Sequence, residues 1–130
     1  MKGMRSQLPL PNVTAEQWCV FDADTGSIIH GKHHDMRREV ASLTKLMTFY
    51  ASWVALQRDC PQHTAASLKI AVSKIYTKVN GTKANLKSGD VLTLEQLYYG
   101  MMLPSGNDAA LVIANYFGSV IAEKKGDERP

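Results

Sequence analysis

An apolar stripe with the period of an α-helix begins directly after Ser42. Its members are Leu43, Leu46, Met47, Tyr50, Trp53 and Val54, which fall on one helical face over about three turns. Ser42 stands where an N-cap belongs, and Pro61 ends the pattern. Because the stripe is so apolar, we expect this helix to be central and the stripe to be buried. Such a helix argues against an all-β fold.

Strands are predicted before this helix, and strands and helices after it. The runs 18–21 and 27–30 are strand-like and flank turn residues, so they predict a β-hairpin, followed by a polar connection over 31–41. Residues 67–72 predict a short strand. Thr93 and Gln96 match a capping box at the start of a second helix. A third helix is predicted from 109 to 117, capped by Asn107 or Asp108 and ended by Gly118.

These elements predict an α/β (α+β) fold, in which a helical cluster follows an N-terminal β-hairpin. We expect residues 1–15 to be an unstructured lead-in, 16–122 to form one domain, and 123–130 to be a polar tail. A chain of 130 residues suits one domain. Its net charge of +3 is too small to indicate nucleic-acid binding. No run of about 18 apolar residues predicts a membrane span.

The cysteines and histidines do not predict a metal site. Cys19 and Cys60 match no metal-ligand spacing; a disulfide between them is possible, and Cys19 is expected to be a small buried residue. His33 and His34 are adjacent and are interpreted as loop residues. No apolar run follows the two early basic residues of the N-terminus, so a signal peptide is not expected.

The helix start also carries a chemical pattern, because Ser42 and Lys45 form an S-x-x-K tetrad. Residues three apart share a helical face, so the lysine amine can reach the serine hydroxyl. A serine becomes nucleophilic when a base takes its proton, and a buried lysine can be that base. The apolar neighbours Leu43, Leu46 and Met47 favour burial. The alternative is an N-cap serine followed by a surface lysine.

A second pattern lies in the turn between the second and third predicted helices. Ser105, Gly106 and Asn107 form an S-x-N triplet. A turn can direct a hydroxyl and an amide into a cleft between helices. The hydroxyl could relay a proton, and the amide could donate to a substrate carbonyl. A Ser-Gly-Asn turn without chemistry is the alternative.

Together these segments resemble a known family. The stretches 40–48 and 99–110 resemble the nucleophile motif and the second motif of D-alanyl-D-alanine carboxypeptidases, which belong with the penicillin-recognising serine peptidases. The segments 21–26 and 81–90 resemble this family's first hairpin and the loop before its second helix pair. The resemblance runs from about Trp18 to Ser119. S-G-N in place of S-D-N favours the carboxypeptidases over class A β-lactamases.

The resemblance implies a role for each matching residue. Ser42 would be acylated, Lys45 would be the general base, Ser105 would shuttle a proton, and Asn107 would bind the substrate's amide. The substrate would be a peptidoglycan stem peptide ending in D-Ala-D-Ala, and β-lactams would be covalent inhibitors. No metal or cofactor is implied. The family normally works outside the cytoplasm.

The sequence departs from the family pattern at its third motif. No Lys-Thr-Gly, Lys-Ser-Gly or His-Thr-Gly triplet follows Asn107, although the family carries one there on a strand. We therefore expect a domain incomplete at its C-terminus, with an incomplete sheet whose open edge could favour association. A non-catalytic fragment, or a penicillin- or peptide-binding module, is the alternative to an active carboxypeptidase.

A remote alternative uses Asp24. Asp24, Thr25 and Gly26 form the triplet of dimeric aspartic proteases, in which two aspartates share a proton. That fold is almost entirely β, so the helical stripe argues against it. The same three residues also make a good hairpin turn.

Overall fold

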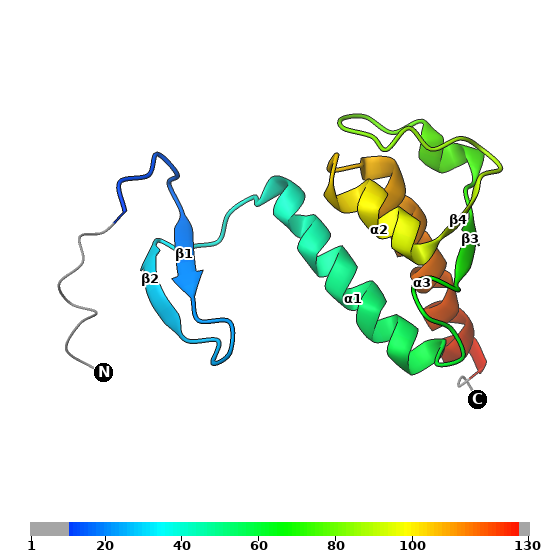
Figure 1. Cartoon of the computed structure of the whole chain (residues 1–130), viewed down its shortest axis with the longest axis horizontal. Helices are drawn as coiled ribbons and strands as arrows, with labels where there is room; N and C mark the ends of the chain where they lie inside the picture. The colour runs from blue at the N-terminus through cyan, green and yellow to red at the C-terminus, as the bar shows by residue number, and fades with distance from the viewer. Residues whose placement is uncertain (1–10, 128–130) are drawn as a thin grey trace. The chain divides into compact units, whose positions relative to one another are not determined.

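The computed structural model describes residues 11–127, which divide into two compact units, 11–39 and 40–127. The first unit is the predicted hairpin. Strands β1 (Trp18–Phe21) and β2 (Ile28–Lys32) pair antiparallel, with Val20 opposite His30 (Figure 1). The expected lead-in over 1–15 lies mostly outside the described residues, and residues 11–17 form neither a helix nor a strand.

The hairpin turn is built around Asp22. Its Oδ1 accepts the backbone N–H groups of Asp24 and Thr25 at 3.2 and 2.9 Å, and Gly26 follows with φ of 67°. Such side-chain-to-backbone bonds favour turns, and glycine adopts positive φ without steric cost. The Asp-Thr-Gly triplet is therefore a turn, as the hairpin reading expects.

The second unit contains the three long helices and a small sheet. Its elements are η1 (Ala41–Leu43), α1 (Thr44–Asp59), β3 (Lys69–Ala71), η2 (Lys74–Thr77), β4 (Val91–Thr93), α2 (Leu94–Met102) and α3 (Asn107–Asp127). Both α1 and α2 pack on α3 (Figure 1). The expected strand within 67–72 is present as β3. Its antiparallel partner β4 was not predicted from the sequence.

The start of α2 confirms the capping box. The backbone N–H of Gln96 donates to Thr93 Oγ1 at 3.1 Å, and the backbone N–H of Thr93 donates to Gln96 Oε1 at 2.9 Å. Two N–H groups that the helix cannot pair internally are satisfied in this way. The cap also joins β4 to α2 without a loop.

Helix α3 is longer than its sequence predicts. The expected end at Gly118 is wrong, because the helix continues to Asp127. A glycine inside a helix costs only about 1 kcal/mol. Val120 and Ile121 lie one turn further along and pack against the core, which favours continuation. Residues 123–127 of the expected polar tail are therefore helical, and 128–130 lie outside the described residues.

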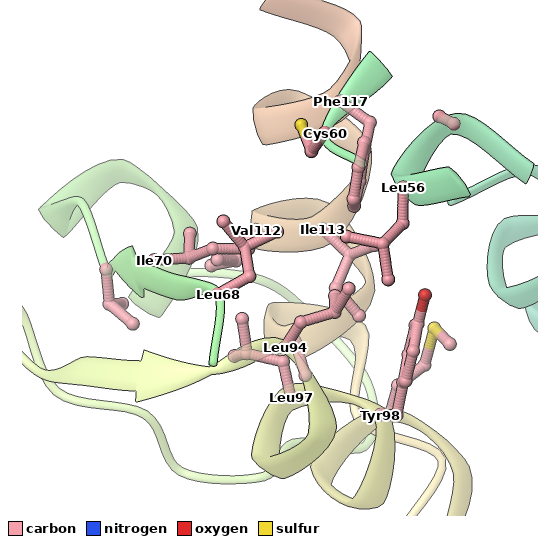
Figure 2. Packing of buried hydrophobic residues seen from close by; sticks show 14 residues of the cluster. Leu56, Cys60, Leu68, Ile70, Leu94, Leu97, Tyr98, Val112, Ile113 and Phe117 are labelled. Atoms are coloured by element: carbon pink, nitrogen blue, oxygen red, sulfur yellow. The ribbon is translucent and has the colours of Figure 1, made fainter. Parts of the chain in front are cut away.

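The core lies where α1, α2 and α3 meet the β3–β4 sheet (Figure 2). Its largest members with the least exposure are Leu56, Leu94, Leu97, Met101 and Ile113. Tyr98 of α2 also lies here, and its hydroxyl is 3.0 Å from that of Ser52 on α1. Burial raises the pKa of Tyr98, and the hydrogen bond to Ser52 partly opposes that shift.

The apolar stripe of α1 is not buried, which corrects the sequence prediction. Its members are 41% to 64% exposed: Leu43, Leu46, Met47, Tyr50, Trp53 and Val54. The face of α1 that packs instead carries Lys45, Ser52, Ala55 and Leu56. The bulky stripe therefore lies outside the packed face of α1 and does not enter the core of the second unit.

Two leucines of α1 give a direct test of this orientation. Leu56→Ala is expected to lower the free energy of unfolding by about 2–5 kcal/mol, because it leaves a cavity in the core. Leu46→Ala, the matched change on the exposed stripe, should cost less than about 1 kcal/mol. Urea unfolding followed by circular dichroism measures both. Equal losses would show that the stripe is packed in solution.

The cysteines are both free thiols. Cys60, directly after α1, is buried in the core. Cys19 is exposed, so the expectation that it is buried is wrong. It lies on β1 of a two-stranded hairpin, and two strands alone cannot enclose a side chain. His33 and His34 lie in the bend and turn after β2, as expected for loop residues.

Candidate active site

The start of α1 places Ser42 beside Lys45. Ser42 lies in the 3₁₀ turn η1, and its hydroxyl is 3.1 Å from Lys45 Nζ. The expectation that Ser42 is the N-cap is wrong, because α1 begins at Thr44 and Leu43 is its N-cap residue, without a side-chain cap bond. The Ser42 hydroxyl instead faces the lysine amine and a second serine.

That second serine comes from the turn between α2 and α3. Ser105 Oγ lies 2.8 Å from Ser42 Oγ and 3.3 Å from Lys45 Nζ. Asn107, the first residue of α3, accepts a hydrogen bond from Lys45 Nζ on its Oδ1 at 2.7 Å. The structure thus brings the four sequence-predicted site residues together, although about 60 positions separate the two segments.

Lys45 is 9% exposed, so the burial expected for it is present. The reason differs from the one that the sequence suggested. Leu43, Leu46 and Met47 are themselves more than half exposed. Lys45 is buried because its side chain turns toward Ser105 and Asn107, whose oxygens accept its hydrogen bonds.

The amide of Asn107 has one orientation that satisfies both of its neighbours. Lys45 Nζ donates to Oδ1 at 2.7 Å, and Nδ2 donates to the backbone carbonyl of Asn80 at 2.7 Å. Sequence reasoning did not find Asn80, because a backbone carbonyl leaves no residue-type signal. The residue after Asn80 is a glycine, and this is the one sequence signal that the segment passes close to Asn107. A Cβ on Gly81, whose φ is 83°, would lie 2.7 Å from Asn107 Nδ2.

The backbone is strained beside the reactive groups. Ser105 has φ of 58° and Ala41, directly before Ser42, has φ of 46°. Residues other than glycine enter this left-handed region at a cost of about 1–2 kcal/mol. Such strain concentrates at functional sites, where the surrounding contacts hold it in place. Here the Thr82 hydroxyl donates to the Ser105 carbonyl at 2.6 Å.

Gly106, between the two predicted site residues, packs against backbone on two sides. A Cβ there would lie 2.5 Å from the Gly100 carbonyl oxygen and 2.8 Å from the Ala84 nitrogen. Only glycine fits without movement of one of these backbones. The middle position of the S-x-N triplet is therefore fixed by packing in this chain.

Two hollows adjoin Ser42 and Lys45. The larger, of about 580 Å³, lies between α1, α3 and the segment around Asn80; it is lined by Ala41, Ser42, Thr44, Lys45, Thr48, Val79, Asn80, Asn107, Ala110, Leu111 and Ala114. The smaller, of about 350 Å³, is lined by Val40, Ser42, Leu43, Lys45, Leu46, Met101, Met102 and Ser105. A ligand could therefore approach the Ser42 hydroxyl.

One Lys-Ser-Gly triplet does occur, at Lys87–Gly89, before the second motif. It does not lie on a strand. It forms a turn, in which the backbone N–H of Asp90 donates to the Lys87 carbonyl at 3.1 Å, ahead of β4. None of its atoms lines either hollow beside Ser42. The triplet thus does not act as a third motif in the described structure.

Residues 11–127 contain neither a candidate metal cluster nor a candidate membrane-spanning helix. No cluster of three or more His, Cys, Asp or Glu side chains in this range could hold a metal ion. None of the helices in the same range combines the length and apolar character that crossing a bilayer requires.

Comparison with known proteins places the chain in a family. The family model described as D-alanyl-D-alanine carboxypeptidase matches residues 3–122. A Streptomyces D-alanyl-D-alanine carboxypeptidase is 35% identical over 109 residues, which cover 84% of this chain and 37% of the relative. The DacD carboxypeptidase of Escherichia coli is 33% identical over 82% of this chain and 28% of its own length.

Solved structures give the same result. The D-alanyl-D-alanine carboxypeptidase DacD from Francisella tularensis superimposes with a TM-score of 0.70 at 33% identity, over 84% of this chain and 26% of that one. Penicillin-binding protein 5 from Haemophilus influenzae gives 0.71 at 25% identity, over 86% and 33%. The fold is thus that of the penicillin-binding serine peptidases.

The chain belongs to the D-alanyl-D-alanine carboxypeptidase family. It spans about a third of the length of the relatives that it matches. The aspartic protease alternative is excluded by this membership, and Asp24 lies in a hairpin turn.

Proposed function

We propose that this chain carries the nucleophile half of a serine-type D-Ala-D-Ala carboxypeptidase, which acts through an acyl-enzyme on Ser42. The observation that carries the proposal is the position of Lys45 Nζ, within hydrogen-bond reach of both the Ser42 and Ser105 hydroxyls. A nucleophile whose hydroxyl lies beside a buried base is the pattern that covalent catalysis requires.

The proposed reaction has two steps. In the first, Ser42 Oγ attacks the carbonyl carbon between the two D-alanines while neutral Lys45 takes its proton. The C–N bond breaks, Lys45 returns the proton to the leaving amine through the Ser105 hydroxyl, and D-alanine departs. In the second, water attacks the ester carbonyl, the bond from that carbon to Ser42 Oγ breaks, one proton of the water passes to Ser42 Oγ, and the shortened peptide is released as a carboxylic acid. Ser105 suits a relay because it lies 2.8 Å from Ser42.

Asn107 is proposed to hold the substrate's amide. Its Oδ1 and one hydrogen of Nδ2 are engaged by Lys45 and Asn80. An amide nitrogen carries two hydrogens, so the second can donate to a substrate carbonyl. On this proposal the substrate is a peptidoglycan stem peptide ending in D-Ala-D-Ala, β-lactams are covalent inhibitors, and the site of action is outside the cytoplasm. Association through the open edges of the β1–β2 hairpin stays a prediction.

A binding module without turnover is the second candidate. It applies to residues 1–130 taken without the segment that carries the family's third motif, because no Lys-Thr-Gly-type triplet stands between Asn107 and Pro130. The family's third motif supplies an oxyanion-hole donor, and loss of one such donor costs about 10²–10³ in rate. On this candidate Ser42 and Lys45 line a ligand site that is not acylated.

Intact mass after incubation with benzylpenicillin tests the proposal. We expect the mass of the folded chain to rise by one penicillin, and peptide mapping to place the adduct on the tryptic peptide that contains Ser42. Hydrolysed penicillin, which has lost its reactive ring, is the matched control and should leave the mass unchanged. A folded chain that acquires no adduct would contradict the acyl-enzyme proposal and support the binding module.

A further inference from the structure

We propose that Asp108 is a positioning residue for the candidate site, because its buried carboxylate fastens the 80–86 loop that orients the amide of Asn107. The catalytic part of this inference rests on the proposed function. The structural part, which links Asp108 to Asn107 through the loop, does not depend on it.

The carboxylate of Asp108 is 1% exposed and binds backbone rather than a basic side chain. Its Oδ1 accepts the N–H of Ala84 at 2.8 Å, and its Oδ2 accepts the N–H of Leu86 at 3.1 Å. Oδ1 also accepts the N–H of Ala109 at 2.9 Å. Position 108 lies in the first turn of α3, where the helix dipole favours negative charge.

The loop held by Asp108 makes three further hydrogen bonds to the site. The Asn80 carbonyl accepts Asn107 Nδ2 at 2.7 Å, and the Thr82 carbonyl accepts the backbone N–H of Asn107 at 2.8 Å. The Thr82 hydroxyl donates to the carbonyl of Ser105 at 2.6 Å. The loop thus contacts Asn107 twice and Ser105 once, and Asp108 anchors the end of the same loop.

These contacts define how Asp108 would act without touching a substrate. The Asn107 amide can direct Oδ1 to Lys45 only while the Asn80 carbonyl holds Nδ2 on the other side. If the loop moves away, the amide loses the acceptor that fixes its orientation. Asn107 Oδ1, the acceptor of the shortest hydrogen bond of Lys45, then no longer stays in place beside the amine.

A carboxylate suits this task better than an amide does. Both oxygens of Asp108 accept a backbone N–H, whereas asparagine has a single acceptor oxygen. In Asp108→Asn the amide nitrogen would face the N–H of Ala84 or of Leu86, donor against donor. This variant therefore releases one of the two loop anchors while preserving the size of the side chain.

The test is NMR on the ¹⁵N-labelled full chain, with Asp90→Asn as the matched control. Asp90 also accepts a loop N–H, that of Lys87 at 2.8 Å, but it does not line the hollows beside Ser42. The Asn107 side-chain amide signal is assigned by its loss in Asn107→Ala. In Asp108→Asn we expect this signal to exchange with water at least about 10-fold faster and to shift, while the Ile113 backbone amide keeps its protection. Asp90→Asn should leave the Asn107 signal unchanged.

Two results would overturn the inference. One is an Asn107 signal that stays unchanged in Asp108→Asn while the Ala84 and Leu86 amides lose protection. The other applies if Asp108→Asn does not fold. In that case, through-hydrogen-bond couplings are measured in the unaltered chain from the Ala84 and Leu86 nitrogens to the Asp108 carboxyl carbon. If these couplings are absent in the folded chain, Asp108 does not bind the loop, and the inference fails.

Penicillin labelling separates this inference from the proposed function. We expect the acylation rate constant of Asp108→Asn to fall about 10-fold or more, and that of Asp90→Asn to stay within twofold. An equal rate in Asp108→Asn and the unaltered chain would overturn the catalytic part. If the unaltered chain is not labelled, the proposed function fails, and the NMR result still decides whether Asp108 orients Asn107.

Discussion

Ser42→Ala is expected to abolish the covalent adduct with benzylpenicillin completely. The variant lacks the hydroxyl oxygen that lies 3.1 Å from Lys45 Nζ and 2.8 Å from Ser105 Oγ. An ester cannot form on a methyl group, so the loss should be total and not graded. Intact mass spectrometry over several hours with excess penicillin measures it.

Ser52→Ala is the matched control for this loss. Ser52 lies on the same helix, and its hydroxyl donates to the Phe49 carbonyl and contacts the Tyr98 hydroxyl, away from Lys45. Its adduct should form at the rate of the unaltered chain, provided that circular dichroism shows both variants folded. An adduct that persists in Ser42→Ala would move the nucleophile elsewhere, with Ser105 as the first alternative to map.

Lys45→Met is expected to slow acylation by about 10²–10⁴-fold, the usual contribution of a general base. Methionine has a side chain of similar length but no amine, so it cannot take the proton from Ser42. It also leaves Asn107 Oδ1 without the hydrogen bond of 2.7 Å that now orients it. Stopped-flow or quenched labelling with a fluorescent penicillin gives the rate constant.

Lys45→Arg separates charge from base strength. Arginine places a positive charge beside Ser105 and Asn107 but does not act as a base at neutral pH, because its guanidinium stays protonated there. We therefore expect it to be as slow as Lys45→Met. An Arg variant that labels at the normal rate would show that a cation alone suffices, and that Lys45 is not the base.

The sequence could predict those features that depend on neighbours along the chain. The hairpin followed from two apolar runs around a turn, and the cap of α2 from the spacing of Thr93 and Gln96. Lys45 reaches Ser42 because only three positions separate them where the turn η1 continues into α1. The meeting of Ser42 with Ser105 is long-range, and it was expected only through the resemblance to a family.

Other features depend on packing that periodicity does not encode. The apolar stripe of α1 fits a buried face, but the second unit packs another face of that helix, which carries Ser52, Ala55 and Leu56. Gly118 predicts a helix end, and contacts of the following turn with the core override it. Asn80 acts through its carbonyl and Asp108 through backbone N–H groups, so residue type alone could not reveal either role.

Because the two halves of the site are far apart along the chain, penicillin labelling can also serve as a probe of folding. Lys45 meets Ser105 and Asn107 across 60 and 62 positions, so the reactive arrangement exists only in chains whose α1 and α3 are packed together. The amount of labelled protein would then report the fraction of molecules that are natively folded. A brief pulse of fluorescent penicillin at increasing urea concentrations would measure the native fraction directly. The same measurement would work in a crude extract, where circular dichroism cannot distinguish one protein from the others.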